Sequence, residues 1–290
     1  MKIRIHHETL YTYSSKVFLN PHQLLLKPLQ RDYLRILEYR LDVAPEPSGI
    51  SERFSLEGNP YFQVWFGESS AELRVMLHAH VESRPFNPYA FVIDSGFLES
   101  VDVAREKPFT YHSEETPLLA PFLAGGEHSE LTSFVRDHMT SGDPILFLTS
   151  LNASLYAEWE HMIRLEENVW EPVYTFHKKQ ASCRDLAWMM MIMLRNAGIA
   201  SRFVSGYAFN PDLDEGHELH AWVEAYLPGA GWIGLDPSLG LLADHHYIPL
   251  ATGHHPSRTL PVHGTVGGDR IVKATLSSRV ELMQTDINQG

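Results

Sequence analysis

The sequence predicts an α+β protein in which an antiparallel β-sandwich precedes a domain of helices and sheet. Three observations lead to this prediction. The first eighty or so residues alternate apolar and polar side chains in short runs, which is typical of strands with one buried face. After Tyr111 the periodicity becomes helical. The run from Leu186 to Leu194 is apolar on all sides, which indicates a helix buried at the centre of the second domain.

Composition limits the possible partners and compartments. The 290 residues are 44% hydrophobic and 11% aromatic, which is typical of a globular chain with a core. The formal net charge of -13 repels phosphate backbones and anionic lipids, so neither nucleic acid nor a membrane surface is an expected partner. No segment has the length and apolar character of a membrane span. One cysteine cannot form an intrachain disulfide, and we expect a cytoplasmic protein.

Residues 1–85 are expected to form the N-terminal β-sandwich. Gly58, Asn59 and Pro60 favour a turn between two of its strands, because Gly and Asn tolerate positive φ and Pro restrains the exit. This block does not cluster nucleophiles with bases, so its expected role is structural or substrate-positioning. The alternating runs are KIRIHHETLYTYS, HQLLLKPL, YLRILEYRLDVAP, YFQVWF and LRVMLHAHVES.

A linker is expected over 86–125, and the second domain over 126–290. Ser129 is a candidate cap for the helix ELTSFVRDHM, and Asp143 followed by Pro has the pattern of a second helix start. The tail after Arg270 alternates again and predicts a last strand or two.

The only cysteine, Cys183, comes directly before the apolar run. Ser182 and Asp185 have the spacing of a capping box, which predicts a helix that begins at Cys183, and Gly198 has the position of a residue that ends it. The dipole of a helix N-terminus favours a thiolate and lowers the thiol pKa from its usual ~8.5. Because a lone cysteine is more often a small buried apolar residue, a catalytic role requires partners.

A predicted β-hairpin supplies these partners. Its strands LHAWVEAYL and WIGLD are joined by a turn at 228–231. If Asp236 lies opposite Trp222, then His220 and Asp236 share one face of the hairpin, about 7–8 Å apart. A slip of one residue would separate them. In acyl transfer, Cys183 would attack a carbonyl, His220 would move the proton, and Asp236 would orient the imidazole.

Four further residues are candidates for supporting roles. The backbone N–H of Cys183 is a natural oxyanion donor, and either Gln180 or the indole of Trp170 could provide a second donor. Trp222 and Trp232 lie on the hairpin strands beside the site and are candidates for substrate binding in an acyl-donor cleft, although such residues more often serve as wall.

The seventeen histidines raise the question of a metal site. His217 and His220 are three residues apart, so on a strand they face opposite sides. The histidine pairs beginning at His245 and His254 lack the paired Cys/His spacing of a structural zinc site. We therefore expect no metal and no cofactor.

The motifs resemble a known family. SCRDLAWMMMIMLRNAGIASRFVSGY followed by LHAWVEAYLPGAGWIGLDPSLG is similar to the core of the transglutaminase-like superfamily, and IHHETLYTY, LEGNPYF and HYIPLATG are similar to bacterial members. The resemblance implies a papain-like fold for the second domain and a catalytic triad of Cys183, His220 and Asp236. Papain-like enzymes often bind substrate between their sheet and helix subdomains, so we expect the cleft there and not in the sandwich.

For the reaction, the resemblance implies a thiol-dependent hydrolase or acyl transferase that acts on amide bonds of a peptide or protein, or on a small amide. A cysteine protease or amidase is the first choice, because water is always available and no amine-binding feature is visible. Cross-linking of protein glutamines by a transglutaminase is the alternative, and a binding module with a residual triad is another. Arg184 stands where some members have Gln or Val, which bears on substrate or pKa.

Overall fold

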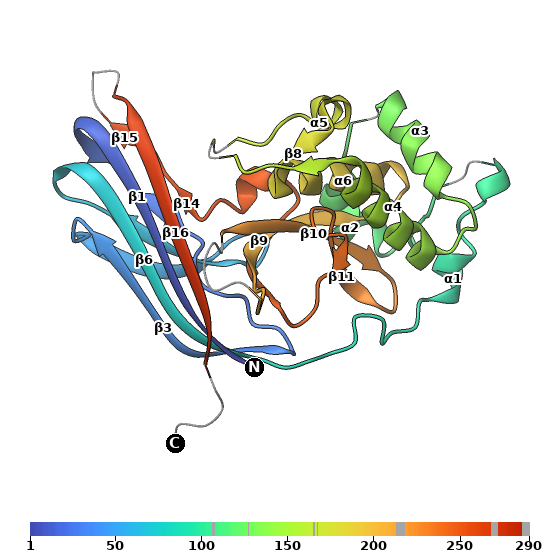
Figure 1. Ribbon diagram of the computed structural model, residues 1–290, viewed down its shortest axis with the longest axis horizontal. Coiled ribbons are helices and arrows are strands. Elements are labelled where there is room, and N and C mark those ends of the chain that lie inside the picture. Colours follow the sequence, from blue (N-terminus) through green and yellow to red (C-terminus); the bar gives the residue numbers. More distant parts are fainter. Residues whose placement is uncertain are drawn as a thin grey trace.

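The computed structural model describes residues 1–105, 108–126, 128–164, 166, 168–212, 218–267 and 272–285. A body made of strands lies beside a body of helices and strands (Figure 1). No helix in the described part of the chain is long and apolar enough to cross a membrane.

One sheet of the strand body is built around β1 (Lys2–Leu19). β6 (Ser69–Ser83) pairs with one edge of β1, and β3 (Leu34–Ala44) pairs with β6. On the other edge of β1 lie β16 (Ala274–Thr285) and the short β15 (Val266–Gly267). All of these pairings are antiparallel, as the sequence predicts.

The second sheet of the strand body has the order β14-β2-β5-β4 and is also antiparallel. The buried residues of both sheets form one apolar cluster, so the two sheets are the layers of a sandwich. The strands of the second sheet are β2 (His22–Leu24), β4 (Gly49–Phe54), β5 (Pro60–Trp65) and β14 (Val262–His263).

The end of the chain returns to the sandwich. The sequence assigns the last strands to the second domain over 126–290, whereas β14, β15 and β16 pair with sandwich strands. β16 pairs with β1 over twelve residues, from Lys2 opposite Thr285 to Tyr13 opposite Ala274. Local periodicity predicts that β16 is a strand but not its distant partner, which explains the difference.

The second body contains a five-stranded antiparallel sheet of order β12-β11-β10-β9-β13. Its strands are β9 (Ser201–Ala208), β10 (His220–Leu227), β11 (Gly231–Asp236), β12 (Leu241–Leu242) and β13 (Tyr247–Gly253). A separate parallel pair joins β7 (Glu160–His161) to β8 (Gln180–Ala181). The helices are α1 (Ser95–Leu98), α2 (Thr116–Leu123), α3 (Ser129–His138), α4 (Pro144–Glu158), α5 (Pro172–Lys178), α6 (Cys183–Asn196) and the short 3-10 turns η1 (Val103–Arg105) and η2 (Pro256–Arg258).

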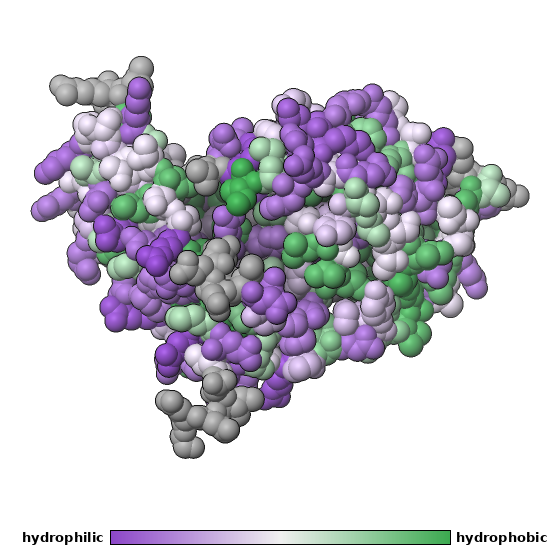
Figure 2. All heavy atoms as spheres, viewed as in Figure 1, coloured by the Kyte–Doolittle hydropathy of each residue, from purple (hydrophilic) through white to green (hydrophobic). Residues whose placement is uncertain are grey.

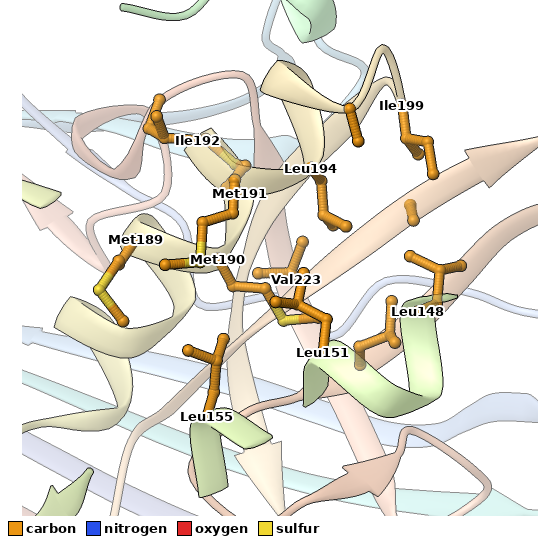
Figure 3. Close-up of a cluster of buried hydrophobic side chains, with 14 of the residues drawn as sticks. Leu148, Leu151, Leu155, Met189, Met190, Met191, Ile192, Leu194, Ile199 and Val223 are labelled. Carbon is orange, nitrogen blue, oxygen red and sulfur yellow. The ribbon is translucent and has the colours of Figure 1, made fainter. Parts of the chain in front are cut away.

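α6 is the centre of this body, as its apolar sequence predicts. It contacts β9 and β10 of the sheet as well as α3, α4 and α5, and its Met190 side chain lies beside Leu151 of α4 and Val223 of β10 (Figure 3). Gly198 ends the helix with φ of 81°, and a Cβ there would lie 2.2 Å from the carbonyl oxygen of Phe109. Glycine is therefore required at this position.

Of the other predicted helix boundaries, one is confirmed and others differ. Asp143 caps α4 by accepting from the N–H groups of Ile145 and Leu146, as expected. Ser129 is the first residue of α3 instead of its cap. The expected linker over 86–125 carries α1 and α2, and its Phe97 belongs to the core around α6.

The two bodies share apolar and polar contacts. Tyr207, Phe209, Ile248 and Leu250 of the α+β domain belong to the apolar cluster of the sandwich. His7 Nδ1 of β1 lies 2.8 Å from the Tyr207 hydroxyl of β9, and both side chains are buried. The sandwich is therefore held directly against the sheet that carries the hairpin.

Candidate active site

Cys183 is the first residue of α6, where the sequence places it. The predicted capping box is present, and Asp185 Oδ2 accepts from the backbone N–H and the hydroxyl of Ser182, at 3.1 and 2.6 Å. The fully buried Asp185 also accepts from Arg164 Nη1 at 2.7 Å and from the backbone N–H of Trp170 at 2.8 Å. These bonds fix the helix start, so the half-buried thiol has a defined position.

The hairpin brings His220 and Asp236 together. β10 and β11 pair with Val223 opposite Leu235, and this register continued by one residue sets Trp222 opposite Asp236, as predicted. His220 Nε2 lies 2.6 Å from Asp236 Oδ2. The predicted contact between the imidazole and the carboxylate is confirmed.

Asp236 is fully buried and has a partner for each oxygen. Oδ1 accepts from the N–H and the hydroxyl of Ser238, at 3.0 and 2.7 Å, and from the N–H of Leu239. Oδ2 accepts from the hydroxyl of Tyr247 at 2.8 Å in addition to His220. Burial raises the pKa of Asp236, but His220 and these hydrogen bonds outweigh burial and lower it from 3.8, so the carboxylate is ionised.

The thiol and the imidazole form a coupled pair. Burial raises the pKa of Cys183, whereas the charge of His220 and hydrogen bonds with His161 and His220 lower it, with a net value of about 6. Burial lowers the pKa of His220, whereas Asp236 and Cys183 raise it well above 6.5. At neutral pH the site therefore holds a thiolate beside an imidazolium.

The sequence reasoning missed a second histidine at the thiol. His161 lies in β7, opposite Ala181 in β8, and its exposed ring is hydrogen bonded to Cys183. That hydrogen bond raises the pKa of His161 above 6.5, while burial opposes the rise. No sequence motif signals this contact, because it depends on a two-residue parallel pairing before the helix.

Cys183 lines a cavity of about 210 Å³. The substrate cleft is expected from the sequence between the sheet and helix subdomains and not in the sandwich. The sandwich nevertheless forms one wall, because Thr9 of β1 and Ser278 of β16 also line the cavity. The surface is hollowed between the two bodies (Figure 2). The reason is the return of β16 to the sandwich, which sequence periodicity does not predict.

Gln180 and Trp170, the two predicted candidates for a second oxyanion donor, both have side chains that contact residues other than Cys183. Gln180 is exposed, and its amide donates to Glu160 Oε2 at 2.7 Å. The Trp170 ring stacks against the guanidinium of Arg164, 4.0 Å from its centroid. Neither residue is among the described residues that line the cavity with Cys183.

The two predicted substrate-binding tryptophans lie elsewhere. Trp222 is 1% exposed and packs against Tyr247, with its ring stacked 6.4 Å from that of His220. Trp232 lies beneath the guanidinium of Arg202, 4.1 Å from the ring centroid. Both line a separate cavity of about 760 Å³. They share the hairpin face of His220 and Asp236, but they line a cavity that does not include the thiol.

The histidines considered as metal ligands have other surroundings. His217 lies outside the described residues, His220 bonds Asp236, and His254 Nδ1 lies 2.6 Å from Glu57 Oε1. Within the described ranges, one group of side chains has ligand atoms close enough to share an ion, namely Asp244, His245 and His246. Asp244 already accepts from the N–H and the ring of His246.

Two protein families match separate parts of the chain. Residues 3–82 match the family described as the bacterial transglutaminase-like N-terminal region, and residues 148–237 match the transglutaminase-like superfamily. The chain is thus a transglutaminase-like superfamily protein with the N-terminal region of the bacterial members. Its fold class is α+β, a papain-like core preceded by an antiparallel sandwich.

The similarity to individual proteins covers different shares of the chain. An uncharacterised protein of Mycobacterium tuberculosis is 25% identical over 91% of this chain and 87% of its own length. A protein-glutamine gamma-glutamyltransferase of Pseudomonas aeruginosa is 36% identical over 22% of this chain and 11% of that protein. A crystal structure of a candidate cysteine protease from Cytophaga hutchinsonii has a TM-score of 0.70 at 19% identity, covering 99% of this chain and 92% of that one, and shows the shared fold.

Proposed function

We propose that this protein is a thiol-dependent hydrolase or acyl transferase that acts on amide bonds, with Cys183 as nucleophile, His220 as general acid and base, and Asp236 as its orienting carboxylate. One observation carries the proposal. The only thiol of the chain is paired with an imidazole that lies 2.6 Å from a buried carboxylate, so thiolate and imidazolium stabilise each other at neutral pH.

The acylation half follows from the positions of the groups. The Cys183 thiolate attacks the amide carbonyl carbon, and the negative charge moves to the carbonyl oxygen. The first N–H groups of a helix have no intrahelical acceptor, so the backbone N–H of Cys183 is available to donate to this oxyanion. When the C–N bond breaks, His220 gives its proton to the departing nitrogen, and a thioester remains on Cys183.

In the second half, neutral His220 accepts a proton from water as the oxygen attacks the thioester. The carbon–sulfur bond breaks and the carboxylic acid leaves, which restores the thiolate and the imidazolium. Asp236 stays ionised throughout, because Ser238 and Tyr247 donate to it. His161 donates to the thiolate and keeps it available for the next cycle.

Hydrolysis is the primary reaction in this proposal, because water requires no dedicated binding site. Cross-linking of protein glutamines is the second candidate, favoured by the similarity to the Pseudomonas aeruginosa protein-glutamine gamma-glutamyltransferase. In that reaction a primary amine would replace water in the attack on the same thioester. The two reactions therefore share Cys183, His220 and Asp236 and differ in the acceptor.

The test is to incubate the protein with a set of peptide amides and glutamine-containing peptides, with and without a primary amine, and to follow products by mass spectrometry. We expect a thioester mass increment on Cys183 and a free acid as the main product. Amine-linked product in excess of acid would assign the cross-linking reaction instead. Absence of acid, amine-linked product and thioester, with the same result in Cys183→Ser, would favour a binding module.

A further inference from the structure

The cavity at Cys183 is a cleft between two domains. Its wall on the α+β side includes Met162 and Ile163 after β7, and Leu219 before β10. The opposite wall belongs to the sandwich. Val262 of β14 lines it, together with residues of β1 and β16, namely His7, Thr9, Tyr11, Leu276, Ser278 and Val280.

The part of the sandwich wall built by β1 and β16 consists of three cross-strand rows. In the antiparallel ladder of β1 and β16, Tyr11 lies opposite Leu276, Thr9 opposite Ser278, and His7 opposite Val280. Because side chains two residues apart share one face of a strand, all three rows face the cavity. The rows run from a partly exposed apolar pair, through a pair of hydroxyls, to a buried pair.

Hydrogen bonds hold this wall in place. His7 Nε2 lies 3.2 Å from Ser278 Oγ and 3.1 Å from Thr9 Oγ1. Its Nδ1 lies 2.8 Å from the hydroxyl of Tyr207 in the α+β domain. A buried contact therefore holds the sandwich wall against the sheet of the α+β domain, as preorganised binding requires.

The charges around the cavity have both signs, with Arg184 and Glu218 in the lining, so they do not single out an ion of either sign. Arg164 is paired with Asp185, and Arg184 donates to the carbonyl oxygens of Arg164 and Glu166 at 2.9 and 2.8 Å. Glu218 adds an exposed carboxylate to the lining. Apolar contact is available instead, because Ile163 is 62% exposed on one wall and Leu276 is 38% exposed on the other.

The size and edge of the cleft point to an extended chain. At about 210 Å³ it is smaller than the roughly 300–1,000 Å³ of sites that enclose a whole drug-sized ligand. Among the described residues, β16 pairs only with β1, so its other edge offers free backbone groups beside the cleft. Such an edge can bind an extended peptide as an added strand.

We propose that this cleft binds the acyl-donor segment of an extended polypeptide and selects an aliphatic or aromatic side chain beside the amide that Cys183 attacks. Leu276 and Ile163 contact that side chain from opposite walls. The inference rests on the proposed function, since it assigns the substrate class of the same thiol. It also gives the sandwich a role in specificity.

The test compares alkylation of Cys183 by two peptidyl chloromethyl ketones, one with Leu and one with Asp beside the reactive carbon. Each reaction forms a carbon–sulfur bond and releases chloride, so no amide turnover is needed. We expect the Leu reagent to react about 10-fold faster or more in the wild-type protein. In Leu276→Ser, which removes the apolar contact without adding a charge, the ratio should fall close to one, with an unchanged rate for iodoacetamide.

Met283→Ser is the matched control, because Met283 is also apolar and exposed on β16 but has the opposite strand parity from Leu276. It should keep the wild-type ratio. Equal rates for both reagents in the wild type, or a Leu preference that survives Leu276→Ser, would overturn the inference while leaving an activated thiol. Slow iodoacetamide reaction with an ordinary thiol pH profile would overturn the proposed function and the inference with it.

Discussion

His220 and His7 are both largely buried histidines near the cleft, and their surroundings drive their pKa values in opposite directions. His220 contacts the thiol and lies 2.6 Å from Asp236, and its pKa is raised well above 6.5. His7 lines the sandwich wall among neutral hydroxyls, and burial together with the charge of His6 lowers its pKa to about 4. Burial without a neighbouring anion therefore gives a neutral structural histidine, and an adjacent carboxylate and thiolate convert a buried histidine into an acid.

The largest effect is expected for the charged histidine. His220→Ala removes the proton carrier and the cation that stabilises the thiolate, so kcat/KM for an amide substrate should fall by about 10³- to 10⁴-fold. Steady-state kinetics would measure this change. His177→Ala, at an exposed histidine outside the cleft, should retain wild-type activity. A loss of less than tenfold in His220→Ala would contradict the proposed role of His220 as the proton carrier for Cys183.

The next largest effect is on stability and concerns the buried carboxylate of Asp185, which is stabilised by an ion pair. Arg164 and Asp185 are 4% and 0% exposed and form an ion pair at the start of α6. Arg164→Met leaves the carboxylate buried without its cation, which should lower the free energy of unfolding by about 3–5 kcal/mol. Urea denaturation would measure it. The double variant with Asp185→Asn should recover part of the loss, and no recovery would argue against the pairing.

A third prediction tests the neutral histidine. Below pH 6.5 the unfolded chain protonates His7, whereas the folded protein does not do so until about pH 4, so stability is lost as pH falls through this window. The lowering from 6.5 to about 4 corresponds to roughly 3 kcal/mol. Urea denaturation of His7→Gln at several pH values should show a shallower loss over the window. Parallel curves for wild type and variant would mean that His7 already carries a proton.

The smallest effect concerns a single hydrogen bond to the carboxylate. Tyr247 donates to the same Asp236 oxygen that His220 contacts. Tyr247→Phe should lower kcat/KM by about 10-fold or somewhat more, since a hydrogen bond to a charged group contributes about 1.5–3 kcal/mol. The exposed Tyr89→Phe is the matched control. If both variants keep full activity, the hydroxyl does not tune the carboxylate.

The residues near one another in sequence were predictable. The start of α6 at Cys183, its end before Gly198, and the hairpin register that joins His220 to Asp236 follow from capping, glycine conformation and strand alternation. These signals are local, within about twenty residues, and each depends on few side chains.

The parts that sequence reasoning missed depend on distant pairing. β16 adds to β1 across nearly the whole chain, which builds the second wall of the cleft. His161 reaches the thiol through the pairing of β7 with β8, and Trp222 and Trp232 turn to another cavity. Residue type predicted the chemistry of these side chains, but their direction is set by tertiary packing.

The most direct test of the central claim is the rate of Cys183 alkylation by iodoacetamide as a function of pH, followed by mass spectrometry. The single cysteine makes the labelled residue unambiguous. The pKa of about 6 predicts a rate that is half-maximal near pH 6 and stays high through neutral pH. A rate that rises only around the usual thiol pKa of ~8.5 or above would contradict the thiolate–imidazolium pair.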